Sequence, residues 1–400
     1  MSLIIDAHVL HSLPLSNPNR DEYGSPKTAV YGAVERSRIS SACLKRGCRI
    51  KVEDILGDRA LRTRRVPGEV AAELRRRGWD EQEATEAGET VVLAAGVKGL
   101  AITEAGVTSV MLYLPAAGIS LLADLVEAHR DTIALAAQQA KAKADADAAK
   151  GKKTGPKTKA PKLDKETDQK VKAVKEQVLQ IIASRNGAIA AFGRMLANTP
   201  EVTVDGAIAV AHAITTHAAD EQRDFFTAVD DVTGTDNGSA HMGNAAYTSG
   251  TFYRYSTINV DELLRNLDGD REAATELTRA FLTEFARYAP SAKKNSTAPF
   301  TPPALVYFAV RADQPINLEG AFEAPVTADD TSGWTAPSIT ALDQHAAATH
   351  AFYGTDALLT AAHSGTAPNL GTLTALGTRI PGLKDLVETI TTAALPEAGQ

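Results

Sequence analysis

The hydrophobic pattern of this chain changes its period twice, and this change constrains the fold more than any other feature. Near Leu3–Leu13, apolar and polar residues alternate as in a β-strand. From about residue 54 to 185, apolar residues recur at three- and four-residue intervals, which indicates helices. Strand-like segments return at 251–260 and 305–310. The order predicts an α+β protein in which a helical domain interrupts a sheet domain.

The chain has 400 residues, 44% of them hydrophobic, which is enough for two cores. We expect residues 1–55 to begin the sheet domain, 56–185 to form the helical insertion and 186–400 to complete the sheet domain. Phe and Gly are mixed in residues 220–250, as expected for a projecting β-hairpin. Further helices are expected at 187–196, 205–217, 261–267 and 272–287. Beyond Pro325 the pattern assigns little.

The most biased segment of the insertion is 141–175, which holds 12 Lys and five acidic residues. Gly and Pro interrupt it, and its centre carries almost no apolar side chain. This composition predicts a solvated, flexible loop. Two interpretations have similar weight: a tolerated surface insertion, or a second contact with nucleic acid that ignores base sequence.

A basic region lies near the start of the chain. Residues 20–77 hold 15 Lys and Arg against 8 Asp and Glu, a net charge of about +7, whereas the whole chain carries −7. Within this region, Ser40 or Ser41 can cap a helix that opens at Ala42. Lys45 and Arg49 then lie four residues apart on one helical face. The pattern favours an anionic partner over cations that merely keep a helix soluble.

Other function classes find little support in the sequence. It contains no G-x-x-x-x-G-K-[ST], G-x-G-x-x-G or H-E-x-x-H motif, so we expect no cofactor. His212 and His217 are five residues apart, which does not suit two metal ligands on one helical face, so no metal site is assigned. The two cysteines, Cys43 and Cys48, fit a reducing compartment. Because no leader peptide or apolar span is evident, we expect a cytoplasmic protein that does not contact a membrane.

Several motifs occur in the order of one known family. They are Asn19-Arg20-Asp21, Lys27, Arg38-Ile39-Ser40-Ser41, Leu44-Lys45-Arg46, Phe192-Gly193-Arg194-Met195, 211–217, 226–231, 238–241 and Phe252-Tyr253-Arg254-Tyr255. In this series the chain resembles the CasC backbone subunit, of the RAMP superfamily, from type I-E CRISPR Cascade complexes. The resemblance extends from residue 3 to about residue 325.

The resemblance implies a modified RNA-recognition-motif fold. A ferredoxin-like sheet forms the palm, the helical insertion forms the fingers, and the hairpin at about 220–250 forms the thumb. It implies no enzymatic activity. The expected role is a CRISPR RNA-binding subunit of a ribonucleoprotein for antiviral defence, which stacks head to tail as a homo-oligomeric filament and flips bases at regular intervals. Expected partners are CRISPR RNA, target DNA, copies of itself, other Cascade subunits and a recruited helicase-nuclease.

Carried over by motif, the resemblance also implies site residues. RNA contacts fall on Arg20, Lys27, Arg38, Ser40, Lys45 and Arg49. The wedge between bases falls on Phe226 and Met242 of the thumb, with Met195 beside them. Possible DNA contacts are Lys141, Lys143, Lys150, Lys152 and Lys153. Where the family usually has Gln after the paired serines, this chain has Ala42, which removes one side-chain hydrogen bond to RNA.

Two alternative functions remain open at this point. Type III backbone subunits of the same superfamily cleave target RNA with a thumb carboxylate, for which Asp230 and Asp231 are candidates by position. Paired aspartates in a hairpin are also common turn formers. The second alternative is a general single-stranded nucleic-acid-binding protein, which the backbone contacts alone would permit.

Overall fold

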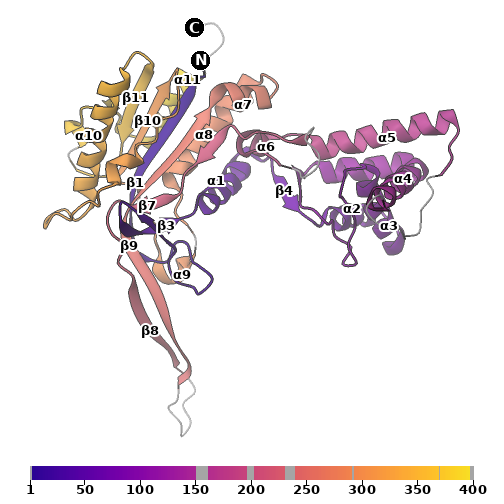
Figure 1. Ribbon diagram of the computed structural model, residues 1–400, viewed down its shortest axis with the longest axis horizontal. Helices are drawn as coiled ribbons and strands as arrows, with labels where there is room; N and C mark the ends of the chain where they lie inside the picture. Colours follow the sequence, from indigo (N-terminus) through magenta and orange to yellow (C-terminus); the bar gives the residue numbers. More distant parts are fainter. Residues whose placement is uncertain are drawn as a thin grey trace. The chain divides into compact units, whose positions relative to one another are not determined.

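The computed structural model describes residues 2–149, 161–195, 202–229, 239–290, 292–368 and 370–396. The chain divides into two compact units. The sheet unit comprises Met1–Leu56 and Ala207–Gln400, and the helical unit comprises Gly57–Gly206. The helical unit therefore reaches Gly206, whereas the sequence pattern places its end at residue 185. The predicted α+β class is confirmed, since a large, mostly antiparallel sheet is combined with helices (Figure 1).

The sheet unit is built on ten strands among its described residues. They are β1 (Ile4–Ser16), β2 (Thr28–Tyr31), β3 (Val34–Ile39), β6 (Ile208–Val210), β7 (Ala213–Thr215), β8 (Gln222–Val229), β9 (Ser239–Asn259), β10 (Leu305–Arg311), β11 (Leu358–Ser364) and β12 (Thr378–Arg379). Their order is β12-β11-β10-β1-β9-β7-β3-β2, and β6 and β8 also pair with β9. Among the strands of the described residues, only β11 and β12 pair in parallel.

Helices accompany this sheet. They are α1 (Ser41–Leu56), α7 (Val260–Asn266), α8 (Arg271–Arg287), α9 (Lys294–Thr297), α10 (Thr335–Tyr353) and α11 (Leu383–Ala394), with short 3-10 turns η2 (Glu319–Phe322) and η3 (Leu370–Thr372). Helix α8 packs against α1 and α11. Helix α10 lies at the opposite face of the sheet from α8 (Figure 1).

Both faces of the central strand β1 are buried, although its sequence alternates. Ile5 and Val9 lie on the face toward α8, where Arg254 opposite Val9 donates from Nη2 to the Phe285 carbonyl. His8 lies on the other face, and its Nδ1 is 2.8 Å from the Tyr253 hydroxyl. His8 is therefore buried with a hydrogen-bond partner, because a layer with α10 and η2 covers this face.

The strand β9 extends beyond the sheet and forms a hairpin with β8. The two strands pair from Gln222 opposite Tyr247 to Val229 opposite Ser239. Further along the same strand, β9 pairs with β1, from Thr248 to Asn259. The hairpin thus projects from the sheet as a continuation of one of its central strands (Figure 1).

The helical unit contains α2 (Val66–Arg76), α3 (Glu81–Ala94), α4 (Gly118–Ala149), α5 (Lys165–Ala183) and α6 (Gly187–Phe192), with a small sheet of β4 (Ala60–Thr63) and β5 (Leu112–Pro115). Its core is aliphatic and includes Val70, Leu74, Val91, Leu122, Val126, Val174 and Val178. Helix α4 is kinked at His129, whose φ of −140° is not helical. The helical periodicity of the insertion is therefore real and forms a core of its own.

Part of the expected Lys-rich loop is helical, which corrects the prediction for 141–175. Residues 141–149 continue α4, and 165–175 lie in α5. The Asp164 carboxylate caps α5 by accepting the Thr167 amide at 2.9 Å. Glu166 and Asp168 then pair with Lys170 and Lys172, each one turn further on. Acidic residues one turn before lysines stabilise a helix that a count of lysines alone does not indicate.

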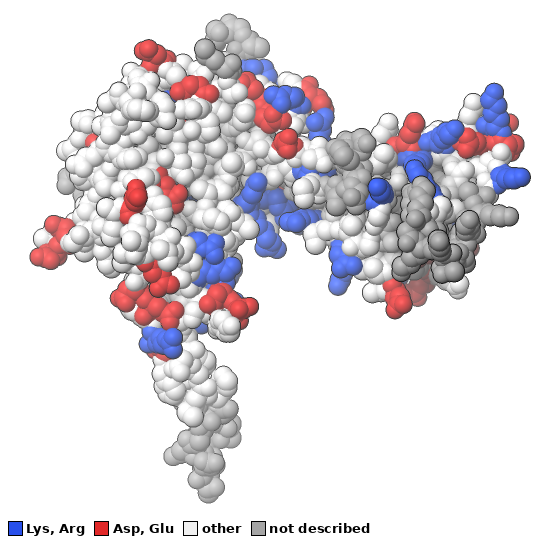
Figure 2. Space-filling view, in the orientation of Figure 1, with Lys and Arg blue, Asp and Glu red and all other residues white. Residues whose placement is uncertain are grey.

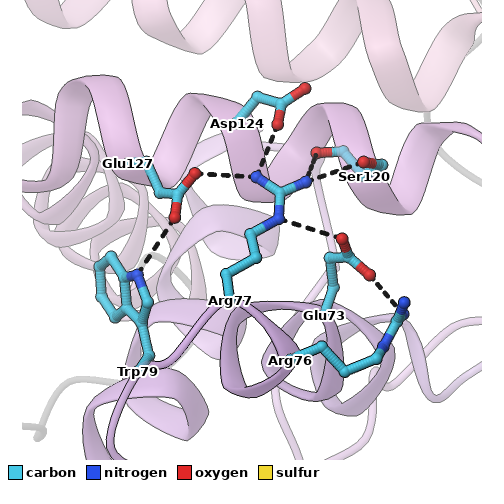
Figure 3. Close-up of polar contacts among 7 residues, drawn as sticks. All are labelled: Glu73, Arg76, Arg77, Trp79, Ser120, Asp124 and Glu127. Carbon is cyan, nitrogen blue, oxygen red and sulfur yellow. Dashed lines mark hydrogen bonds and ion pairs between the residues drawn. The ribbon is translucent and has the colours of Figure 1, made fainter.

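One arginine joins α2 to α4 in the helical unit (Figure 3). Arg77 follows α2, and its Nη1 donates to Asp124 at 2.6 Å and to Glu127 at 2.8 Å. Its Nε donates to Glu73 at 3.0 Å. The three carboxylates raise the pKa of Arg77. Glu127 also accepts from Trp79 Nε1 at 3.3 Å, so one network fixes the end of α2 and the tryptophan against α4.

Two other expectations change. The helix expected at 205–217 is replaced by β6 and β7, which pair with β9, because pairing with a sheet overrides the helix propensity of an Ala-rich segment. Beyond Pro325, where the pattern assigned little, the chain forms α10, β11, β12 and α11.

No helix within the described residues has an apolar stretch long enough to cross a lipid bilayer. Likewise, in the described ranges no three His, Cys, Asp or Glu side chains gather where they could hold a metal ion.

The Arg77 network gives a stability prediction for the helical unit. Arg77→Met should lower the free energy of unfolding by about 1–2 kcal/mol, because three carboxylates lose a shared partner. Arg75→Met is the matched control, since Arg75 makes a single exposed pair with Glu81, and it should cost less than about 0.5 kcal/mol. Urea unfolding followed by Trp79 fluorescence, in a Trp334→Phe background, measures both. Equal effects of the two substitutions would contradict the role given to the network.

Candidate nucleic-acid interface

The predicted RNA-binding corner is a strand-to-helix turn in the sheet unit, where β3 ends at Ile39 and α1 begins at Ser41. Ser40 caps the helix: its Oγ accepts the Cys43 amide at 3.3 Å, and its carbonyl accepts the same amide at 2.9 Å. Of the two serines considered from the sequence, Ser40 is therefore the cap. Ala42 is exposed in the first turn of α1. Its side chain is only a methyl group, which leaves that turn open to a ligand.

The loop before β2 is hydrogen-bonded to this turn. The Asn19 side-chain oxygen accepts the Ser40 amide at 2.9 Å, and the Asn19 carbonyl accepts the Lys27 amide at 2.8 Å. The Lys27 carbonyl in turn accepts the Arg38 amide at 2.7 Å. These bonds bring Arg20, Lys27, Arg38 and Ser40 to one corner, although they are up to 20 residues apart in the sequence.

The two cations of α1 that the sequence assigned to the site, Lys45 and Arg49, differ in environment. Leu44, Cys48 and Val52 form the buried face of the helix, and Lys45 lies beside it, half-buried, so that burial lowers its pKa. The Arg49 side chain is only 17% exposed, and its Nη1 lies 2.5 Å from Glu53 Oε1. The two cationic groups expected on one helical face therefore differ in environment, because a carboxylate holds the Arg49 guanidinium along the helix.

Lys and Arg gather over α1 on the face of the sheet unit drawn in Figure 2. Arg46, which the sequence analysis did not assign to the site, is exposed on this helix. Its position directly after Lys45 in the sequence could have indicated that it belongs to the same basic site.

A histidine to which the sequence assigned no metal site also lies in this corner. His212 connects β6 to β7 and is exposed. Its Nδ1 accepts the Ser41 amide at 3.0 Å, and Arg38 Nη1 donates to the same nitrogen at 3.2 Å. Partial burial and the neighbouring Arg38 guanidinium lower the pKa of His212. Only the pairing of β3 with β7 brings it here, so spacing along the chain could not place it.

The hairpin carries apolar side chains on both of its faces. Phe226 lies opposite Gly243, and its ring covers that glycine so closely that a Cβ atom there would come within 2.8 Å of Cζ. Its ring also contacts His241, at 5.8 Å between centroids. Met242 lies opposite Thr227, one residue along, and so points to the other face.

The predicted wedge is therefore divided between two faces. Phe225 shares the face of Met242, because it lies diagonally across the strand pair, and the two side chains are 61% and 62% exposed. Phe226, on the opposite face, is 43% exposed. The sequence analysis omitted Phe225, although strand alternation places adjacent phenylalanines on opposite faces.

The remaining predicted residues lie elsewhere. Met195 follows α6 in the helical unit and is exposed, and its place beside the hairpin stays a prediction. Lys141 and Lys143 are exposed on α4. Lys150, Lys152 and Lys153 lie outside the described residues, as do Asp230 and Asp231 of the cleavage alternative.

Comparisons with known proteins cover almost the whole chain. The model of the family described as CT1975-like protein matches residues 5–389. A chain in the structure of a "CRISPR RNA-guided surveillance complex, pre-nicking" is 38% identical, with a TM-score of 0.82, over 98% of this chain and 100% of that one. A second, from a "CRISPR RNA-guided surveillance complex", is 33% identical, with a TM-score of 0.72, over 98% and 99%. No curated protein matches. From the family match and these identities, the chain belongs to the CT1975-like protein family.

Proposed function

We propose that this protein is a CRISPR RNA-binding backbone subunit of a surveillance complex. The observation that carries the proposal is the 38% identity, over 98% of this chain and 100% of the other, to a chain of a CRISPR RNA-guided surveillance complex. The basic corner and the hairpin support it independently, because they offer an anionic strand both phosphate contacts and apolar surface.

The finer assignment rests on the collinear motifs of the sequence. On that basis we assign the chain to the CasC-like subunits of type I-E Cascade, with a modified RNA-recognition-motif palm formed by the sheet unit. Copies of the chain stack head to tail along the spacer, and the guide bases remain available to pair with target DNA. Other Cascade subunits complete the complex, and a recruited helicase-nuclease degrades the DNA. The protein itself binds and does not cleave.

In this proposal the corner holds the RNA backbone. Arg20, Lys27 and Arg38 surround the capped start of α1, where amide groups and helix dipole add positive potential. Such contacts neutralise phosphates without reading base sequence. Lys141 and Lys143 on α4 are suited to contact the phosphates of target DNA in the same manner.

The two apolar faces of the hairpin suit a wedge. A wedge that separates two stacked bases must present apolar surface to both of them. Phe226 meets the base on one side, and Phe225 with Met242 meets the base on the other.

Native mass spectrometry of the protein, co-expressed with CRISPR RNAs of two spacer lengths, tests the proposed function. We expect the number of bound copies to rise with spacer length. A protein free of RNA in both samples would refute the proposal. Equal loading of an unrelated single-stranded RNA would favour a general single-strand binder, and metal-dependent cuts in a complementary RNA would favour the cleavage alternative.

Lys45→Ala should weaken RNA binding by a similar factor for every spacer sequence. It should also lower the slope of log K against log salt by about 0.7, the value for one phosphate contact with a single strand. Lys51→Ala, which removes an exposed cation further along α1, is the control and should change the slope less. Arg49→Ala should fall between them, because Glu53 already holds that guanidinium. Salt titrations by fluorescence anisotropy provide the slopes; a loss that depends on spacer sequence would contradict backbone binding.

Phe226→Ala and the double variant Phe225→Ala/Met242→Ala should both leave the protein folded, because these side chains are exposed. Each should reduce the fluorescence of 2-aminopurine placed at the flipped positions of the RNA, since one side of the wedge is lost. Thr227→Ala, next to Phe226 on β8 and opposite Met242, is the control. If only one of the two variants changes base stacking, the hairpin acts with one face and the two-sided wedge is wrong.

A further inference from the structure

We propose that His212 is itself an RNA-binding residue, whose Nε2–H donates a hydrogen bond to an oxygen of the ribose-phosphate backbone. The inference rests on the proposed function and adds to it a neutral contact among cationic ones. It follows from the way the structure fixes the two ring nitrogens.

The hydrogen-bond partners of His212 Nδ1 determine which ring nitrogen carries the proton. The Ser41 amide that donates to it at 3.0 Å is a backbone N–H, which can only donate. Arg38, at 3.2 Å, also has only donors to offer. Nδ1 therefore carries a lone pair, and the single proton of the neutral ring is on Nε2.

The location of His212 in the corner suits a contact between Nε2 and RNA. His212 is exposed, so a ligand can reach its side chain. It lies beside Arg38 and the amide of Ser41, the residue that follows the Ser40 cap, where the corner attracts an anionic strand. A fixed donor in a positive field suits a phosphate oxygen or a ribose 2′-hydroxyl oxygen.

Nδ1 and Nε2 have different roles, which two substitutions can distinguish. Nδ1 positions Arg38 and the first amide of α1, whereas Nε2 is free of that task. In His212→Asn, the amide oxygen can lie where Nδ1 lies and preserve the positioning, but the outward donor is lost. In His212→Gln, the amide nitrogen can reach the place of Nε2, but the acceptor for Ser41 is lost.

The experiment measures the affinity of the full chain, as wild type and as both variants, for a short single-stranded RNA by fluorescence anisotropy. We expect His212→Asn to bind about tenfold more weakly at unchanged melting temperature. Since the lost donor is neutral, the factor should be the same at every salt concentration, unlike that of Lys45→Ala. His212→Gln should recover part of the affinity. Wild-type affinity of His212→Asn would overturn the inference, because positioning alone would then explain the histidine.

A second readout applies if His212→Asn loses stability. In wild-type protein with ¹⁵N-labelled histidine rings, the Nε2 resonance of His212 should shift when RNA is added. An Nε2 resonance that does not respond to RNA would overturn the inference.

Binding to single-stranded DNA of the same sequence distinguishes a phosphate oxygen from a ribose 2′-hydroxyl oxygen as the acceptor. If His212 contacts phosphate, His212→Asn weakens RNA and DNA binding alike, whereas a 2′-hydroxyl contact weakens only RNA binding. Failure of the proposed function gives a different result, because in the mass-spectrometry experiment wild-type protein would then not load CRISPR RNA in step with spacer length, whatever the effect of His212→Asn on a short RNA.

Discussion

The structure depends on the pairing of β9 along its whole length. One part of this strand pairs with β1, β6 and β7 inside the sheet, and the other pairs with β8 in the projecting hairpin. Because one strand serves both, the hairpin continues the hydrogen-bond ladder of a buried sheet and is not attached through a loop. Apolar side chains that would be poorly positioned on a loop thereby gain a defined register.

Electrostatics at the corner depend on how charges are distributed, since the chain as a whole is negative. Arg20, Lys27 and Arg38 meet at one turn, because the loop from Asn19 to Lys27 is hydrogen-bonded to that turn. Glu53 pairs with Arg49, and in our proposal His212 adds an uncharged hydrogen-bond donor. In the proposed function, the corner both attracts an anionic strand and restricts how that strand can lie.

Much of this could be predicted from local patterns. The strand near Leu3–Leu13, the capped helix after Ser40, the hairpin and the two helices after β9 all follow from periodicity and turn chemistry. The prediction failed at 205–217, where three-residue strands exist only because β9 lies beside them. It also missed His212, since no spacing along the chain reveals a contact made through sheet pairing. The opposite faces of Phe226 and Met242 could have been deduced, but only once the register of the hairpin was known.

The way in which the helical unit joins the sheet unit has a consequence for how such chains diversify. The helical unit is one uninterrupted segment, Gly57–Gly206, that leaves after α1 and returns before β6. Helix α1 and β6 are in contact, so the ends of the segment are anchored to neighbouring elements. Closing a loop between neighbouring anchors costs little entropy, and that cost grows slowly with length. Insertions of different size can therefore be exchanged at this point while the sheet and its hairpin remain as they are.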